Sequence, residues 1–136
     1  GARTRSEQVT ELWIEQGRSP PVIQLLSGSE AVARVPLRKG EWVDTLRTPV
    51  LPGLNQLRVR STGFLRVRSR DSFASVMELR SGTAVMDWIR NGRTSADDDG
   101  SGVFVVEVPV GAYEFMAADG SRVRVLVEKG KTASAY

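Results

Sequence analysis

Short runs of Val, Ile, Leu and aromatic residues recur along the whole chain, separated at close intervals by Gly and Pro. Several of these runs alternate between apolar and polar residues, which is the pattern of a strand with one buried face. Most runs are too short for a helix, and the Gly and Pro residues between them favour turns. The pattern therefore predicts an all-β protein, built as a β-sandwich.

The expected strands follow the apolar runs. They span residues 9–15, 22–26, 31–35, 42–47, 55–60, 64–70, 75–80, 84–90, 103–108, 112–117 and 122–128. One helix is the alternative in the middle of the chain, where Asp71 or Ser72 would cap it and Phe73, Val76 and Met77 would share a face. We favour the strand at 75–80 over that helix because of an internal repeat.

Two parts of the chain resemble each other. Residues 22–29 (VIQLLSGS) match residues 76–83 (VMELRSGT), and the apolar pattern of 57–67 matches that of 115–125. Similarity at a period of about 55 residues predicts a duplicated β unit. The alternative is that two β-meanders look alike because β patterning is monotonous. The duplication divides the chain into an N-terminal segment or edge strand (1–17), a first β unit (18–72) and a second β unit (73–136), in tandem.

A hairpin is predicted near the end of each half. With residues 61–63 as a three-residue loop, nearly all apolar residues of the flanking strands fall on one face. With residues 119–121 as the equivalent loop, Phe115 lies opposite Val125 and the apolar residues again share a face. The common loop length supports the duplication.

The end of the second half carries a Pro-x-Gly-x-Tyr turn at 109–113 and a Gly-Lys-Thr ending at 130–132. The proline ends the pairing of one strand, the glycine permits a sharp turn and the tyrosine anchors the next strand. Residues 103–132 resemble the closing strands of prealbumin-like sandwich modules, of the carboxypeptidase-regulatory, Cna-B and PEGA types. The first half departs from this pattern at Asn55, which replaces the aromatic residue. The resemblance implies an immunoglobulin-like or prealbumin-like sandwich that serves as a non-catalytic, extracytoplasmic spacer or adhesion module.

The chain contains no Cys and no His. This composition excludes a disulfide framework, a thiolate nucleophile, a Ser–His pair and any metal site that depends on His or Cys ligands. No pair of carboxylates and no Gly-rich phosphate loop stands out. We therefore expect a protein that is not an enzyme and that uses no cofactor.

Residues 97–102 (DDDGSG) resemble a calcium loop at first sight. In a loop that starts at Asp97, however, the twelfth position is Val108, where an EF-hand needs a bidentate Glu. We interpret the segment as a flexible acidic loop and expect no metal site.

Arginine greatly outnumbers lysine, since the chain's lysines are Lys39, Lys129 and Lys131 alone. In the first predicted hairpin, Arg58 lies opposite Arg66. Like charges in that position destabilise a strand pair, so an acidic neighbour, solvent or an anionic partner should compensate. The candidate anion-binding strip comprises Arg58, Arg60, Arg66, Arg68 and Arg70. The alternative is a solvated outer face in an Arg-rich bacterial proteome, and the lack of interleaved aromatic residues argues against nucleic acid.

Three tryptophans, Trp13, Trp42 and Trp88, are candidates for stacking against sugar rings, although core positions are the more common role of such residues. The apolar stretches are too short to span a membrane. We expect a non-enzymatic interaction module of a bacterial cell-envelope or secreted assembly, which binds a protein partner or an acidic polysaccharide. One alternative is a structural subunit of a pilus, phage or secretion machine that self-associates through its edge strands. Another is an accessory carbohydrate-binding domain of a carbohydrate-active enzyme.

Overall fold

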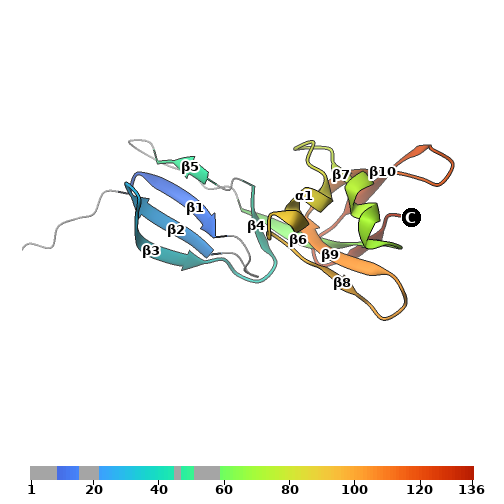
Figure 1. Cartoon of the computed structure of the whole chain (residues 1–136), viewed down its shortest axis with the longest axis horizontal. Helices are drawn as coiled ribbons and strands as arrows, with labels where there is room; N and C mark the ends of the chain where they lie inside the picture. Colours follow the sequence, from blue (N-terminus) through green and yellow to red (C-terminus); the bar gives the residue numbers. More distant parts are fainter. Residues whose placement is uncertain (1–8, 16–21, 45–46, 51–58) are drawn as a thin grey trace, which may run out of the picture.

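The computed structural model describes residues 9–15, 22–44, 47–50 and 59–136. Most of the described elements are strands, arranged in several antiparallel sheets, which confirms the all-β prediction. Figure 1 shows a four-stranded sheet at one end of the molecule and the remaining strands gathered at the other.

The four-stranded sheet has the order β3-β2-β1-β5, and all of its neighbours are antiparallel. Its strands are β1 (Glu11–Glu15), β2 (Val22–Ser27), β3 (Glu30–Pro36) and β5 (Arg47–Pro49). Leu12 and Ile14 of β1 share an apolar face with Leu25 and Ile23 of β2, because alternate residues of a strand point to the same side.

A small core covers the apolar face of this sheet. Ile14 of β1 lies directly opposite Ile23 of β2, and both are buried together with Leu37 and Val43. Val43 belongs to the short strand β4 (Glu41–Val43), which follows β3 in the chain but is not part of this sheet. β4 therefore contributes a side chain to the core of a sheet to which it does not belong.

The longest strand, β6 (Val59–Val67), organises the rest of the molecule. One of its edges pairs with β9 (Phe104–Pro109), which in turn pairs with β8 (Ala96–Asp98). Its other edge pairs first with β4, antiparallel, and then with β12 (Thr132–Ser134), parallel.

Strands β4 and β12 lie end to end along that second edge of β6, and they meet at Thr62. The Thr62 amide donates a hydrogen bond to the Gly40 carbonyl (3.0 Å), and the Thr62 carbonyl accepts one from the Gly130 amide (2.9 Å). The N–H and C=O groups of one strand residue point to the same edge, so both contacts lie on one side of β6.

A third sheet has the order β11-β10-β7. Its strands are β7 (Met77–Glu78), β10 (Gly111–Met116) and β11 (Arg122–Val127). A 3₁₀ helix, η1 (Arg70–Ser75), and a short α-helix, α1 (Val85–Arg90), pack beside one another next to it. Within the described ranges, no helix has the length and apolar character needed to cross a membrane.

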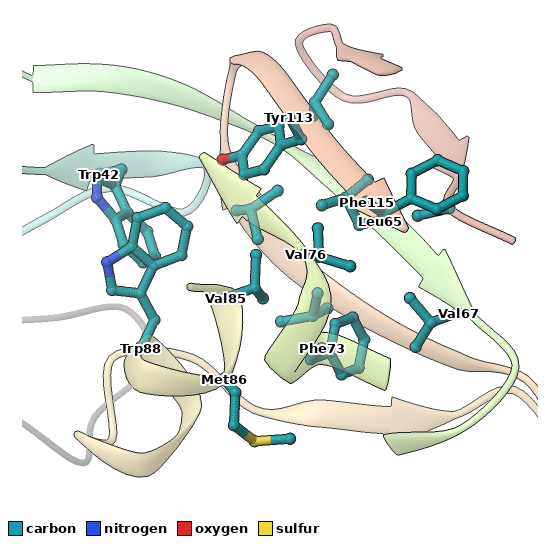
Figure 2. Packing of buried hydrophobic residues seen from close by; sticks show 14 residues of the cluster. Trp42, Leu65, Val67, Phe73, Val76, Val85, Met86, Trp88, Tyr113 and Phe115 are labelled. Carbon is teal, nitrogen blue, oxygen red and sulfur yellow. The ribbon is translucent and has the colours of Figure 1, made fainter. Parts of the chain in front are cut away.

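The larger core lies between the sheet built on β6 and the sheet built on β10, and Figure 2 shows its side chains. Strands β6, β9 and β10 each contribute alternate residues to this core, namely Leu65 and Val67, Val106 and Val108, and Tyr113 and Phe115. Its buried members are Trp42, Leu65, Val67, Phe73, Val76, Val85, Met86, Trp88, Val106, Val108, Tyr113, Phe115, Val127 and Ala135.

The hairpin predicted at residues 61–63 is wrong, because β6 runs through these residues without a turn. A Ser-Thr-Gly sequence is typical of a loop. Here the backbone of Thr62 instead forms hydrogen bonds with Gly40 and Gly130, which keep it in the strand. A Cβ atom on Gly63 would clash with the Glu128 carbonyl and lie 2.6 Å from Val127 Cγ1, so the glycine permits close contact with the segment after β11. Arg66 consequently lies opposite Val105 and Ser134 rather than Arg58.

The second predicted hairpin exists, with its three-residue loop at 118–120 instead of 119–121. Phe115 therefore lies opposite Val123 rather than Val125. The partner of each β10 residue is thus displaced by two residues along β11. Because the side chains of a strand alternate with a period of two, the apolar residues stay on one face.

The strand predicted at 84–90 is wrong, since these residues form α1. Val85, Met86 and Trp88 are buried along one side of the helix, a spacing that fits a helical period better than a strand period. Asp87 in its first turn and Arg90 in its last turn stabilise the helix, because their charges interact favourably with the helix dipole.

The helix considered in the middle of the chain is present in part, as η1 with Phe73 buried, and is followed by the two-residue strand β7. Strands β8 and β12 were not predicted, and β8 includes the first two residues of the segment interpreted as a flexible acidic loop. The strand predicted at 42–47 is present only as the short strand β4, and β5 shares only Arg47 with it.

The predicted units 18–72 and 73–136 share a sheet, because β6 pairs with both β9 and β12. The tandem arrangement is not confirmed, since the two halves do not share the hairpin that supported it.

Candidate functional site

Arg60, the second residue of β6, is engaged inside the protein. Its guanidinium donates to Glu78 Oε2 (3.0 Å), to the Val110 carbonyl (3.0 Å) and, through Nε, to Asp44 Oδ1 (3.0 Å). Burial lowers the pKa of Arg60, but the hydrogen bonds and charges of Glu78 and Asp44 outweigh it, so the pKa lies above its ordinary value. Arg60 therefore ties β6 to β7 and to the end of β4.

The Glu78 carboxylate has no exposed surface and lies at the centre of this network. The Tyr113 hydroxyl donates to the Pro109 carbonyl (2.6 Å) and lies 3.5 Å from Glu78 Oε2. Burial, followed by the Glu78 charge, raises the pKa of Tyr113 well above its ordinary value. The tyrosine thus stays neutral and serves as an anchor, as the sequence pattern of 109–113 predicted.

Two of the three tryptophans belong to the core. Trp42 and Trp88 are 3 % and 6 % exposed, and their rings meet edge to face at 4.9 Å between centroids (Figure 2). Neither ring offers a face to a sugar. The Arg93 guanidinium lies 4.3 Å from the centroid of Trp42 and donates to the carbonyls of Val43 and Asp44. Burial lowers the pKa of Arg93 to about 10, so it remains charged at neutral pH.

Trp13 differs from the other tryptophans because it lies on β1 and is partly exposed. Its register neighbours are Gln24 of β2 and Arg47 of β5. Of the three stacking candidates, Trp13 alone has an accessible surface.

The other arginines of the predicted strip have separate environments. Arg58 lies outside the described residues. Arg66 forms an ion pair with Asp99 (2.9 Å), and the Arg68 guanidinium lies 4.8 Å from the centroid of the Tyr136 ring. Arg70 begins η1 and is exposed. The structure therefore does not place Arg60 beside the other arginines on one exposed surface.

A different basic site lies where β4 and β12 meet along β6. A cavity of about 380 Å³ opens there, which we call the junction pocket. Two turns with the same Lys-Gly sequence form its rim, Lys39-Gly40 before β4 and Lys129-Gly130 before β12. Both glycines have positive φ, +84° and +68°, the left-handed conformation that glycine adopts without strain.

Thr62 holds both turns in place through its backbone, because it pairs with Gly40 and with Gly130. Lys39 and Lys129, which are 90 positions apart in the sequence, consequently line one cavity together with Arg38. The close approach that Gly63 permits brings the second turn against β6. The convergence of these cations follows from the pairing of β6 rather than from any local motif.

The junction pocket also contains hydrogen-bond acceptors and an aromatic ring. Glu41 and Glu107 line it, and Glu107 Oε2 accepts a hydrogen bond from the Thr62 hydroxyl (2.5 Å). Ser61 and the partly buried Phe64 complete the wall. The arrangement can bind an acid group at the cations, accept hydrogen bonds from hydroxyl groups at the carboxylates and pack an apolar surface on the ring.

The sequence did not predict the junction pocket, because the predicted hairpin placed Thr62 in a loop, where it could not join two distant turns. The sequence does contain one indication of the pocket: all three lysines of the chain fall in or beside two short segments with the sequence Lys-Gly. Lys131, the third lysine, forms an ion pair with Glu128 (3.1 Å) directly after the second turn.

The acidic segment 97–102 is organised by local hydrogen bonds. Asp99 accepts from the Ser101 amide (2.9 Å) and hydroxyl (2.5 Å), which lower the pKa of Asp99, and Arg66 adds to this effect. Across the described ranges of the chain, no three acidic side chains cluster closely enough to hold a metal ion.

The chain matches no protein-family model, and no curated protein or solved structure is significantly similar to it.

Proposed function

We propose that this chain is a non-enzymatic interaction module of a bacterial cell-envelope or secreted assembly, and that its junction pocket binds an acidic polysaccharide. The observation that carries the proposal is the convergence of Arg38, Lys39 and Lys129 on one cavity from two separate turns. A concentration of positive charge in a concave site attracts anions and raises their rate of association.

The carboxylates in the same pocket narrow the class of ligand. Glu41 and Glu107 would repel a compact, highly charged anion such as phosphate. They would accept hydrogen bonds from the hydroxyl groups of a sugar. A uronic acid has both a carboxylate for the cations and hydroxyl groups for the two glutamates, so it fits the pocket better than an anion without donors.

Size and apolar surface support the same ligand. A volume of about 380 Å³ lies within the usual range for small-molecule sites, about 300–1,000 Å³. Phe64 offers a ring against which the C–H face of a sugar can pack. A short stretch of a polysaccharide would enter the pocket while the rest of the polymer extends outside it.

The proposal includes the type of β-sandwich and the cellular location of the protein. We infer an immunoglobulin-like or prealbumin-like sandwich, supported by the resemblance of residues 103–132 and by the buried Tyr113 at the position that the resemblance assigns to an anchor. An extracytoplasmic place in a bacterial assembly is supported by that resemblance and by the Arg-rich composition.

Calorimetric titration with a tetramer of galacturonic acid tests the proposal, with a tetramer of galactose as the neutral comparison. We expect the acidic tetramer alone to bind, with an affinity that falls as salt rises from about 50 to about 200 mM. The double variant Lys39→Glu/Lys129→Glu should lose about tenfold or more, since hydrogen bonds to charged groups contribute about 1.5–3 kcal/mol each.

Arg70→Glu is the control, because it makes at one exposed position on η1 the charge reversal that the double variant makes at each lysine. Its affinity should stay within about twofold of the parent protein. Equal binding of the two tetramers, or a loss in Arg70→Glu with none in the lysine variant, would contradict the proposal.

A further inference from the structure

A hollow of about 290 Å³ lies at one end of the larger core. Phe115 and Ala135, which are buried members of that core, both line it. Figure 2 shows Phe115 at the side of the core away from Trp42 and Trp88. The hollow therefore leads from the surface to the apolar interior. We call it the Arg68 hollow, and besides two serines of η1 its lining includes Arg68, Phe115, Ala117, Ala118, Ala135 and Tyr136.

Most of the lining of the Arg68 hollow is apolar, and much of it is small. Ala117 and Ala118 directly follow β10, and Ala135 directly follows β12. Methyl side chains leave space at this end of the core that larger side chains would fill. The Phe115 ring is 7 % exposed and adds a broad apolar surface. An apolar group that entered the hollow would leave water and gain the free energy of burial.

Arg68 supplies a cation beside this apolar surface. Among the described residues, Arg68 alone brings a charged side chain to the lining, and its side chain is exposed. The guanidinium lies 4.8 Å from the centroid of the Tyr136 ring. A cation–π contact of this kind is made with the face of the ring and leaves the N–H groups of the guanidinium able to donate hydrogen bonds.

The charge of Arg68 is not compensated in the way that the charges of its neighbours on β6 are. Arg60 is paired with Glu78, and Arg66 is paired with Asp99. Within the described ranges, no carboxylate forms an ion pair with Arg68. A ligand that satisfies both the cation and the apolar lining must carry one anionic group on an apolar body.

We propose that the Arg68 hollow binds a small apolar monocarboxylate. Its carboxylate pairs with the guanidinium of Arg68, which can donate two parallel hydrogen bonds to such a group. Its apolar body packs against Phe115 and the three alanines. The volume lies near the lower end of the range for small-molecule sites, about 300 Å³, so the body is about as large as one ring with a short side chain.

The Arg68 hollow and the junction pocket should select different anions. The junction pocket contains Glu41 and Glu107, which can accept hydrogen bonds from hydroxyl groups, whereas the Arg68 hollow offers alanines and Phe115. The two sites also lie at different places along β6, since the junction pocket is formed at Thr62 and Arg68 follows the last residue of the strand. Binding at the Arg68 hollow therefore does not depend on the proposed function.

An NMR titration of the labelled full chain with 3-phenylpropionate tests the proposal. The amide signals of Ala117, Ala118 and Tyr136 should shift together and saturate with a dissociation constant of about 1 mM or lower. The neutral analogue 3-phenylpropan-1-ol should bind about fivefold more weakly, as expected when an exposed charge pair is lost. Acetate, which has the charge without the apolar body, should cause no saturable shift in the same concentration range.

Two variants, each with a matched control, test the two parts of the hollow. Ala117→Phe fills the hollow and should abolish the shifts, whereas Ala112→Phe, at an exposed alanine of β10 whose side chain points to the opposite face, should preserve them. Arg68→Gln should weaken binding of 3-phenylpropionate about fivefold and leave binding of the alcohol unchanged. Arg124→Gln removes an arginine whose side chain is 76 % exposed on β11 and should change neither affinity.

The outcomes separate the two sites. The double variant Lys39→Glu/Lys129→Glu should bind 3-phenylpropionate as the parent protein does, because it changes the junction pocket alone. The proposal is overturned if the alcohol or acetate binds as tightly as 3-phenylpropionate. It is also overturned if Arg68→Gln keeps the parent affinity, a result that does not depend on whether Ala117→Phe folds.

Discussion

Glu78 shows how a single charged residue can stabilise this fold only as part of a set. Its carboxylate has no exposed surface, and Arg60 and Tyr113 surround it. A buried charge costs several kcal/mol unless its partners replace the lost hydration. The ion pair therefore fixes the relative positions of β6, β7 and β10, rather than adding stability in proportion to its charge.

Removing one member of the pair should be strongly destabilising. Glu78→Leu would leave the Arg60 guanidinium largely buried without its principal partner, so the free energy of unfolding should fall by about 3–5 kcal/mol. Urea denaturation measures the change. The double variant Arg60→Met/Glu78→Leu should recover much of the loss, and a single variant within about 0.5 kcal/mol of the parent protein would show that the pair is not structurally important.

The sequence predicted Tyr113 as an anchor of its strand, because residues 109–113 have the recognisable Pro-x-Gly-x-Tyr pattern. It did not identify the role of Arg60. A row of arginines on one strand looks like a charged surface, and only the packing of β7 and the end of β4 against β6 shows that Arg60 is internal.

Among the elements, strands with regular alternation were predicted well. β2, β9, β10 and β11 lie within one or two residues of their expected bounds, because each is a short apolar run that ends close to Gly, Pro or Ser residues. β6 was divided in two because its Ser-Thr-Gly segment has turn composition, and long-range pairing overrides that preference.

The β10–β11 hairpin carries a prediction that depends on pH. Asp119 in its loop accepts hydrogen bonds from the hydroxyl and amide of Ser121, which lower the pKa of Asp119. Because the folded-state pKa is below the unfolded value, this interaction stabilises the hairpin at neutral pH and is lost as the pH falls through the lowered pKa. Ser121→Ala should raise the pKa of Asp119 toward 3.8, measured by NMR titration. An unchanged pKa would mean that the hydroxyl does not bind the carboxylate.

For the molecule as a whole, the strand β4 connects two cores of different size. Trp42 packs in the larger core and its neighbour Val43 in the smaller one. Among the residues that the structure describes, the smaller core has four buried members, fewer than the larger core, so less described apolar burial supports its sheet. The sequence could not reveal this division, because both cores are built from residues with the same alternation.

Hydrogen exchange should resolve the two parts. The amides of β2 should exchange faster than those of β6, because strands over a small core open at a lower free energy than strands in the main core. Equal protection of Ile23 and Leu65 would indicate a single cooperative unit and would contradict the division.

We propose that the two Lys-Gly turns held by Thr62 form a site for an acidic sugar, and an NMR titration of the labelled protein with tetragalacturonate can show whether both turns bind it. The amide signals of Gly40, Thr62 and Gly130 should shift together and saturate with one dissociation constant. Shifts confined to the arginines at 66–70, or shifts at only one of the two turns, would contradict it.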